Sequence, residues 1–184
     1  MDEAIWGRRH ELLFNVRRSR RYHLWRVRLL HRWNTFRMVF FLVTTSVVAT
    51  TLIGEVAPDM QDLWKRLSLV PALLAALDIV LRSGDRESEH RSFARSFVSL
   101  EGSVMREGFG ISEERLAELE AEYLEIEVNE PPISPLLNRI CYNEEVRASY
   151  SEEEWGALLK PIPLEGWLLS LWYQMPRVKV RISS

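Results

Sequence analysis

The feature that most constrains the fold of this chain is an uncharged apolar stretch at residues 38–54. Its sequence is Met-Val-Phe-Phe-Leu-Val-Thr-Thr-Ser-Val-Val-Ala-Thr-Thr-Leu-Ile-Gly. As a helix, a stretch of this length would span about 26 Å, close to the thickness of the hydrocarbon core of a bilayer. The alternative is a buried helix or strand of a soluble core, because Val and Thr favour strands. The length of the stretch and the arginines that precede it favour a membrane-spanning helix.

A second apolar segment follows after a short polar break. Residues 55–61 contain Pro58 and charged side chains, which predict a turn. Residues 63–81 are mostly apolar and begin with Leu-Trp-Lys-Arg, a sequence typical of the membrane interface, where Lys and Arg side chains extend toward the headgroups. We therefore predict a two-transmembrane helical hairpin over residues 38–82, with its spans at residues 38–54 and 63–81.

The charges are distributed unevenly along the chain. Residues 1–37 hold ten arginines and three acidic residues, whereas residues 83–184 hold 11 basic and 19 acidic residues. Loops rich in Arg and Lys stay on the cytoplasmic side of a membrane. A hairpin returns the chain to the side from which it started. We therefore expect a multi-pass protein with both termini in the cytoplasm.

Residues 1–37 show the pattern of a basic amphipathic helix, predicted from about residue 11 to residue 37. Apolar side chains recur there at helical spacing, at Tyr22, Trp25, Leu29, Trp33 and Phe36. Such a helix suits either nucleic-acid phosphates or anionic lipid headgroups. The neighbouring apolar stretch favours lipid, so no nucleic-acid partner is expected. The candidate headgroup contacts are Arg20, Arg21, Arg28 and Arg32, together with Trp64, Lys65 and Arg66 at the start of the second span.

Residues 83–150 predict an acidic cytoplasmic bundle of three helices, docked against the basic helix by opposite charge. Apolar periodicity places the helices at residues 85–106, after Ser112, and at residues 136–150. Ser112 is a candidate N-cap, because two glutamates follow it where the helix dipole favours acids. The whole pattern predicts an all-α membrane protein.

Residues 151–184 form a separate Trp-rich tail. Its aromatic side chains suit either the headgroup level of a membrane or a packing patch on the bundle. Its last residues, 177–182, alternate charged and apolar side chains, as in a half-exposed strand that pairs with another subunit.

Both predicted spans carry small or hydroxylated residues at every fourth position, which include Ser46, Thr50 and Gly54 in the first span. Such stripes allow helices to approach closely. They therefore predict either packing of the two spans on each other or, in a homo-oligomer, a polar path lined by these residues. Asp78 is the one ionisable residue within the apolar runs at residues 38–54 and 67–81. It suits either an ion pair with Arg82 or a role in the pore.

Several short motifs resemble the SLATT family (SMODS and SLOG-associating two-transmembrane effector domain). They are Arg21-Tyr22-His23, Ala-Ala-Leu-Asp ending at Asp78, His90 on a helix followed by Phe-Val-Ser-Leu-Glu at residues 97–101, Glu130-Pro131, and Cys-Tyr-Asn-Glu at residues 141–144. The resemblance covers residues 10–150. It implies an effector of a bacterial antiviral or conflict system in the inner membrane. Such an effector forms a pore or disrupts the membrane when a partner sensor or nucleotide-signal synthase activates it.

No motif in the sequence predicts catalysis. The chain has no Gly-rich phosphate loop, no Gly-x-Ser-x-Gly and no His-Glu-x-x-His, and its single Cys excludes a Cys-based zinc site. His23 and His31 are expected on the helix surface or at headgroups. We therefore predict a protein that is not an enzyme and has no catalytic residue, metal or cofactor. Two functions stay open: an oligomeric pore or membrane-disrupting effector, and a non-conducting membrane anchor that presents the bundle to a partner.

Overall fold

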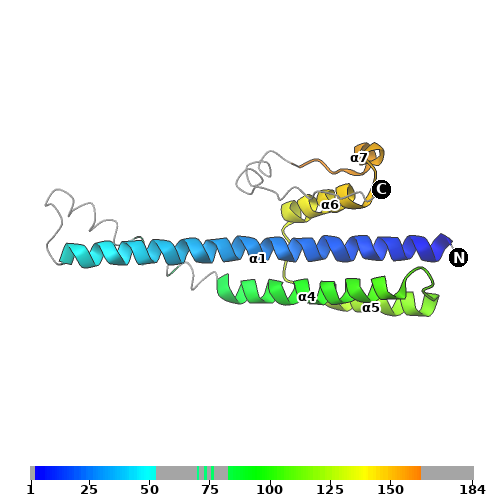
Figure 1. Cartoon of the computed structure of the whole chain (residues 1–184), viewed down its shortest axis with the longest axis horizontal. Coiled ribbons are helices and arrows are strands. Elements are labelled where there is room, and N and C mark those ends of the chain that lie inside the picture. The colour runs from blue at the N-terminus through cyan, green and yellow to red at the C-terminus, as the bar shows by residue number, and fades with distance from the viewer. Residues whose placement is uncertain (1–2, 53–69, 71–72, 74–75, 77–82, 163–184) are drawn as a thin grey trace. The chain divides into compact units, whose positions relative to one another are not determined.

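The computed structural model describes residues 3–52, 70, 73, 76 and 83–162, and all regular secondary structure in these residues is α-helical. The all-α part of the predicted fold class is thereby confirmed. The helices are α1 (Glu3–Leu52), α4 (Ser83–Glu107), α5 (Glu113–Val128), α6 (Pro135–Ser149) and α7 (Glu152–Leu158) (Figure 1). Most of the second predicted span and most of the tail lie outside the described residues.

The chain divides into two compact units. The first consists of Met1–Leu24 and Ser92–Ser184, and the second of Trp25–Arg91. Helices α1 and α4 contribute residues to both units, whereas α5, α6 and α7 belong to the first.

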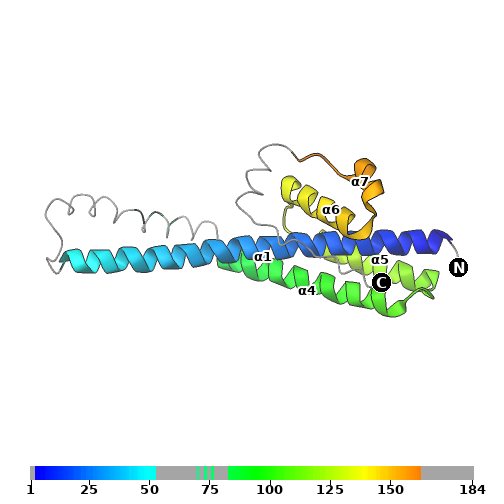
Figure 2. The same ribbon diagram turned by 45° about the horizontal axis from the view of Figure 1, so that its top comes forward.

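The first unit has one apolar core between α1, α4 and α5. In this unit α4 and α5 run along one side of α1 and α6 runs along another side (Figures 1 and 2). On α4, Phe97, Leu100 and Val104 are fully buried. The remaining members of the core are Leu12, Leu13, Val16, Ile111, Leu116, Leu119 and Tyr123.

Helix α1 begins at Glu3 and not near residue 11, so the predicted start was wrong. Leu12, Leu13 and Val16 are buried in the core, and the turns before them continue the same helix. The arginines around these residues hide their periodicity in the sequence. Arg has a long apolar stem and can border a core while its guanidinium stays in contact with carboxylates.

Ser112 caps α5, as predicted. Its extended backbone (φ −77°, ψ 158°) ends the preceding loop, and its Oγ accepts a hydrogen bond from the backbone N–H of Arg115 at 3.2 Å. Ser112→Ala removes this acceptor, so we expect it to lower the free energy of unfolding by about 1 kcal/mol. Ser112→Asp keeps an acceptor and should retain most of the stability. Equal losses in the two variants, measured by thermal unfolding in mild detergent, would contradict a capping role.

The loop between α5 and α6 is attached to α1. The backbone N–H of Ser134 donates to the hydroxyl of Tyr22 at 2.8 Å, and Pro135 occupies the first turn of α6, where its missing N–H costs nothing. Tyr22 is almost fully buried, so this hydrogen bond is shielded from water. It fixes the start of α6 against the middle of α1.

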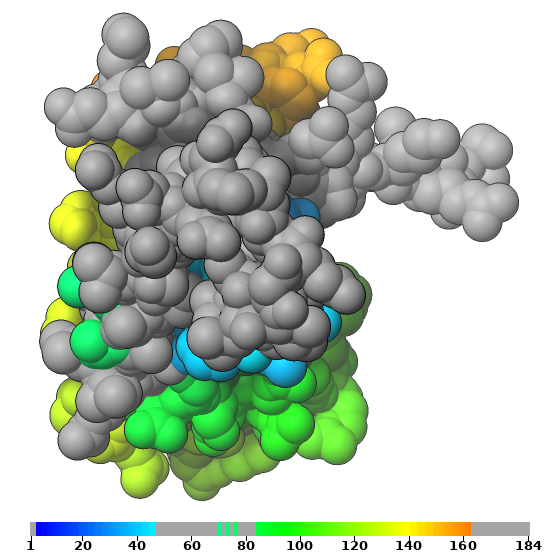
Figure 3. Space-filling model, turned by 90° about the vertical axis from the view of Figure 1, so that its left-hand side faces the viewer, coloured from blue at the N-terminus to red at the C-terminus, as the bar shows by residue number. Residues whose placement is uncertain are grey.

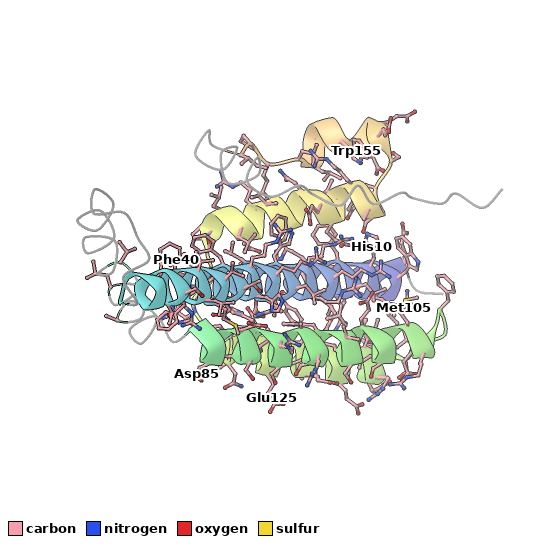
Figure 4. The ribbon with its side chains drawn as sticks, turned by 60° about the vertical axis from the view of Figure 1, so that its left-hand side comes forward. His10, Phe40, Asp85, Met105, Glu125 and Trp155 are labelled. Carbon is pink, nitrogen blue, oxygen red and sulfur yellow. The ribbon has the colours of Figure 1, made fainter. Side chains whose placement is uncertain are left out.

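In the second unit, residues 26–34 in the middle of α1 lie beside the first turns of α4. The side chain of Asn34 donates to Glu87 at 2.9 Å, and Arg26 Nε lies 3.4 Å from the Nε2 of buried His90. The space-filling view looks along α1 from its last described turns, so the cyan side chains of α1 lie in front of the green side chains of α4 (Figure 3). Phe40 marks the later part of α1 and Asp85 the start of α4 (Figure 4).

Further along α1, large apolar side chains are exposed. They have exposed fractions from 50% at Phe41 to 69% at Leu42. The set is Phe36, Met38, Val39, Phe41, Leu42 and Val43. Within the described residues, no helix combines the length and the apolar character that crossing a membrane requires. The first predicted span ends at Gly54, beyond the last described residue of α1.

Candidate functional site

The basic face of α1 meets carboxylates of three other helices in the first unit, and we call these contacts the ionic seam. Its members are Arg8, Arg17, Arg20 and Arg21 of α1, Glu101 of α4, Glu113 and Glu120 of α5, and Glu145 of α6. The docking of the basic helix on the acidic bundle, expected from the charge distribution, is therefore observed.

Most of the seam is partly exposed. Arg17 Nε donates to Glu101 at 2.9 Å, and Arg20 pairs with the other oxygen of the same carboxylate. Arg8 donates to Glu120 at 2.6 Å, and this hydrogen bond raises the pKa of its guanidinium. Ion pairs with this degree of exposure contribute little stability each, so their main effect is to select which face of α1 meets the bundle.

The pair between Arg21 and Glu145 is different because its carboxylate is buried. Arg21 Nε donates to Glu145 at 2.6 Å, and the Glu145 side chain is only 1% exposed. The second carboxylate oxygen accepts a hydrogen bond from the hydroxyl of Ser149 at 2.8 Å. A buried carboxylate that lost its cation would be strongly destabilising. This pair therefore fixes α6 in one register on α1.

His23 lies at the centre of the first unit and not on its surface, so the expectation of a surface or headgroup contact was wrong. Its side chain is fully buried, and its ring stacks on Phe93 and Phe97 with centroids 5.2 and 5.7 Å apart. Its Nε2 lies 3.2 Å from the Oε1 of Glu130, whose side chain is 4% exposed. By contrast, His31 is on the surface, with its side chain 67% exposed.

A cluster of aromatic rings joins α1 to α6. His10 stacks on Trp6, and its Nε2 lies 3.2 Å from the hydroxyl of Tyr150. Phe14 packs edge-on against Tyr142 and Tyr150. Figure 4 shows His10 on the side of α1 that faces α6. The contacts with Tyr142 and Tyr150 link residues more than a hundred positions apart, and no local pattern in the sequence pointed to them.

The chemistry of the described residues is that of packing and ion pairing. Burial raises the pKa of the Cys141 thiol, so the thiol stays protonated at neutral pH and is a poor nucleophile or metal ligand. Among the residues that the structure describes, no group of three or more His, Cys, Asp and Glu side chains has the geometry of a metal site.

The predicted headgroup contacts of α1 fall into two groups. Arg20 and Arg21 are held by Glu101 and Glu145, so in this state their guanidinium groups face the bundle and not lipid, which corrects the expectation for these two residues. Arg28 and Arg32 are exposed on α1 in the second unit. The two groups could not be separated from local patterns, because the partners of the first group are distant along the chain.

The predicted residues of the spans are described only in part. Ser46 is exposed on α1, and its hydroxyl donates to the carbonyl of Leu42 at 2.8 Å. Thr50 lies in the last turn of α1. The other candidates lie outside the described residues, and they are Gly54, Trp64, Lys65, Arg66 and Asp78.

Glu87 connects α1 and α4 in the second unit, and the pKa of its carboxyl group predicts how the stability of the fold depends on acid pH. Partial burial tends to raise the pKa of its carboxyl group, but hydrogen bonds from Asn34 and Arg91 outweigh burial and lower the pKa below its ordinary 4.5. A lowered pKa in the folded state gives stability that is present above about pH 4.5 and is lost as the pH falls through the lower value. Glu87→Gln should therefore flatten the stability profile below pH 5 in acid titration. If Glu87→Gln lost stability below pH 5 as steeply as the unsubstituted chain, this role of Glu87 would be contradicted.

Comparisons with protein-family models, with curated proteins and with solved structures found no match.

Proposed function

We propose that this protein is a two-pass protein of the bacterial inner membrane with both termini in the cytoplasm. The observation that carries the proposal is the set of apolar side chains around α1 at residues 38–43. Successive helical residues differ in direction by about 100°, so the exposed side chains of Met38, Val39, Phe41, Leu42 and Val43 cover more than half of the circumference. The half-buried Phe40 points to the remaining side. A helix that is apolar on all sides belongs in lipid or in the interior of a larger assembly.

The hydroxyl groups in the same segment support this proposal. Thr44 donates to the carbonyls of Phe40 and Phe41 at 2.8 and 3.0 Å, and Ser46 donates to Leu42. Each hydroxyl is therefore satisfied inside its own helix. In lipid a polar group has no water to bond to, so internal satisfaction is required there.

The function proposed is that of a membrane effector in an antiviral or conflict system, which is what the resemblance to the SLATT family implies. Copies of the chain assemble through the stripe of Ser46, Thr50 and Gly54, and the assembly opens a pore or disrupts the membrane. A partner sensor or nucleotide-signal synthase supplies the trigger.

A non-conducting anchor is the second candidate, and a specific observation favours it. Because the hydroxyls of Thr44 and Ser46 bond to their own helix, they do not need a water-filled path. In this alternative the spans only hold the acidic bundle at the membrane for a partner.

Induction of the chain in bacterial cells distinguishes the two candidates. The effector should collapse the membrane potential and admit a membrane-impermeant dye, and Thr50→Leu should reduce dye entry at least tenfold at equal membrane expression. Thr35→Leu is the matched control, because it makes the same change outside the predicted span and should keep dye entry. An intact potential with the partner system active would contradict the effector and favour the anchor.

A further inference from the structure

The segment that follows α7 is bound to α6 as an extended peptide. Asn143 of α6 is 3% exposed, and its side-chain amide forms two hydrogen bonds with the backbone of a single residue, Lys160. Its Nδ2 donates to the carbonyl of Lys160 at 2.7 Å, and its Oδ1 accepts from the backbone N–H of Lys160 at 2.9 Å. This two-point contact recognises extended backbone without regard to the side chain.

Two further contacts complete the site, of which the first selects a lysine side chain and the second binds the backbone. The ammonium group of Lys160 lies 3.9 Å from the ring centroid of Tyr142, which is a close cation–π contact. Arg139 donates to the carbonyl of Pro161 at 2.9 Å. Leu159 enters the site with φ −68° and ψ 132°, which is close to the extended polyproline II conformation. Together, Arg139, Tyr142 and Asn143 form a site for an extended Lys-Pro peptide, which we call the α6 peptide site.

Helix α7, which comes directly before this peptide, has few other contacts with the first unit. Helix α7 has no buried residue, and Trp155 connects it to the end of α6 through one hydrogen bond to the carbonyl of Tyr150 at 3.1 Å. Tyr150 and Ser151, between α6 and α7, are both extended, with φ −124° and ψ 156° and φ −68° and ψ 158°. A change in the ψ angle of Tyr150 would direct α7 away from its own α6, while the hydrogen bond from Tyr150 N–H to Val146 and the capping box of Ser151 and Glu154 are kept.

We propose that the α6 peptide site receives residues 159–161 from a second copy of this chain when copies assemble. The exchanged segment makes the same hydrogen bonds in a neighbouring copy as in its own, so exchange costs little and links the subunits. The inference deepens the proposed function, because it rests on the assembly of several copies and names the cytoplasmic contact that joins them.

Crosslinking between two differently tagged full-length copies tests the exchange. One copy carries Arg139→Cys and the other Pro161→Cys, and both are produced together and treated in membranes with a short bifunctional maleimide. Native Cys141 is buried and is present in every variant, so it contributes equally to all of them. A single chain that carries both substitutions is the comparison, and it measures crosslinking within one copy. Asn143→Ala, added to the Arg139→Cys copy, is the matched loss-of-site variant.

Exchange predicts a crosslinked product that carries both tags, reduced at least tenfold by Asn143→Ala and by an excess of the peptide Trp-Gly-Ala-Leu-Leu-Lys-Pro-Ile (residues 155–162). Crosslinking only within the doubly substituted chain, or no crosslink in either arrangement, would overturn the inference. Dye entry in the same cells is measured separately. A chain that still opens the membrane without intermolecular crosslinks would refute the exchange and leave the effector function standing.

Discussion

Arg21→Ala is expected to lower the free energy of unfolding by about 3 kcal/mol. The substitution leaves the carboxylate of Glu145, which is only 1% exposed, with a hydrogen bond from the hydroxyl of Ser149 but without its counter-ion. A buried charge without its counter-ion must be desolvated without compensation, and this is among the most destabilising changes that a single substitution makes. Urea denaturation in mild detergent, followed by Trp fluorescence, measures the loss.

Two companion variants show whether burial is the cause. Arg115→Ala removes an arginine whose pairs with Glu107 and Glu118 are exposed, so we expect a much smaller loss. The double variant Arg21→Met with Glu145→Leu replaces both charges by apolar side chains and should recover most of the lost stability. Equal losses for Arg21→Ala and Arg115→Ala would contradict the role assigned to the buried pair.

Phe97→Ala is expected to lower the free energy of unfolding by about 3–5 kcal/mol. Phe97 is fully buried, and its ring contacts His23 at 5.7 Å and Tyr123 at 6.0 Å between centroids. Truncation removes the ring from the junction of α1, α4 and α5 and leaves a cavity that rigid helices close only in part. Thermal unfolding of the same detergent-solubilised chain measures the effect.

Val98→Ala is the matched control, because Val98 is the next residue of α4 and is 51% exposed. It should change stability by less than about 0.5 kcal/mol. If the two variants were equally stable, the first unit would not have its core where the structure places it.

Local patterns predicted the helices of the bundle closely. The predicted helix at residues 85–106 is observed as Ser83–Glu107, and the one at residues 136–150 as Pro135–Ser149. Apolar spacing and the capping signal at Ser112 are local properties, and the structure obeys them. Within the first unit, tertiary packing agrees with these local preferences.

Long-range partners could not be predicted in the same way. The sequence shows that residues 1–37 are basic and that the following domain is acidic, but any arginine can pair with any carboxylate at that level. Which pairs form depends on the register of α6 and α4 on α1, as for Arg21 with Glu145 and Arg17 with Glu101. His23 was misplaced for the same reason, because the rings that bury it, Phe93 and Phe97, are about 70 positions away in the sequence.

Membrane fractionation shows whether residues 38–54 lie within the lipid bilayer. The chain should sediment with bacterial membranes, stay in the pellet through alkaline extraction, and enter solution only with detergent. Leu42→Arg combined with Val43→Arg, at two of the exposed apolar positions of α1, should weaken that retention. A monodisperse chain in the supernatant without detergent would contradict the account.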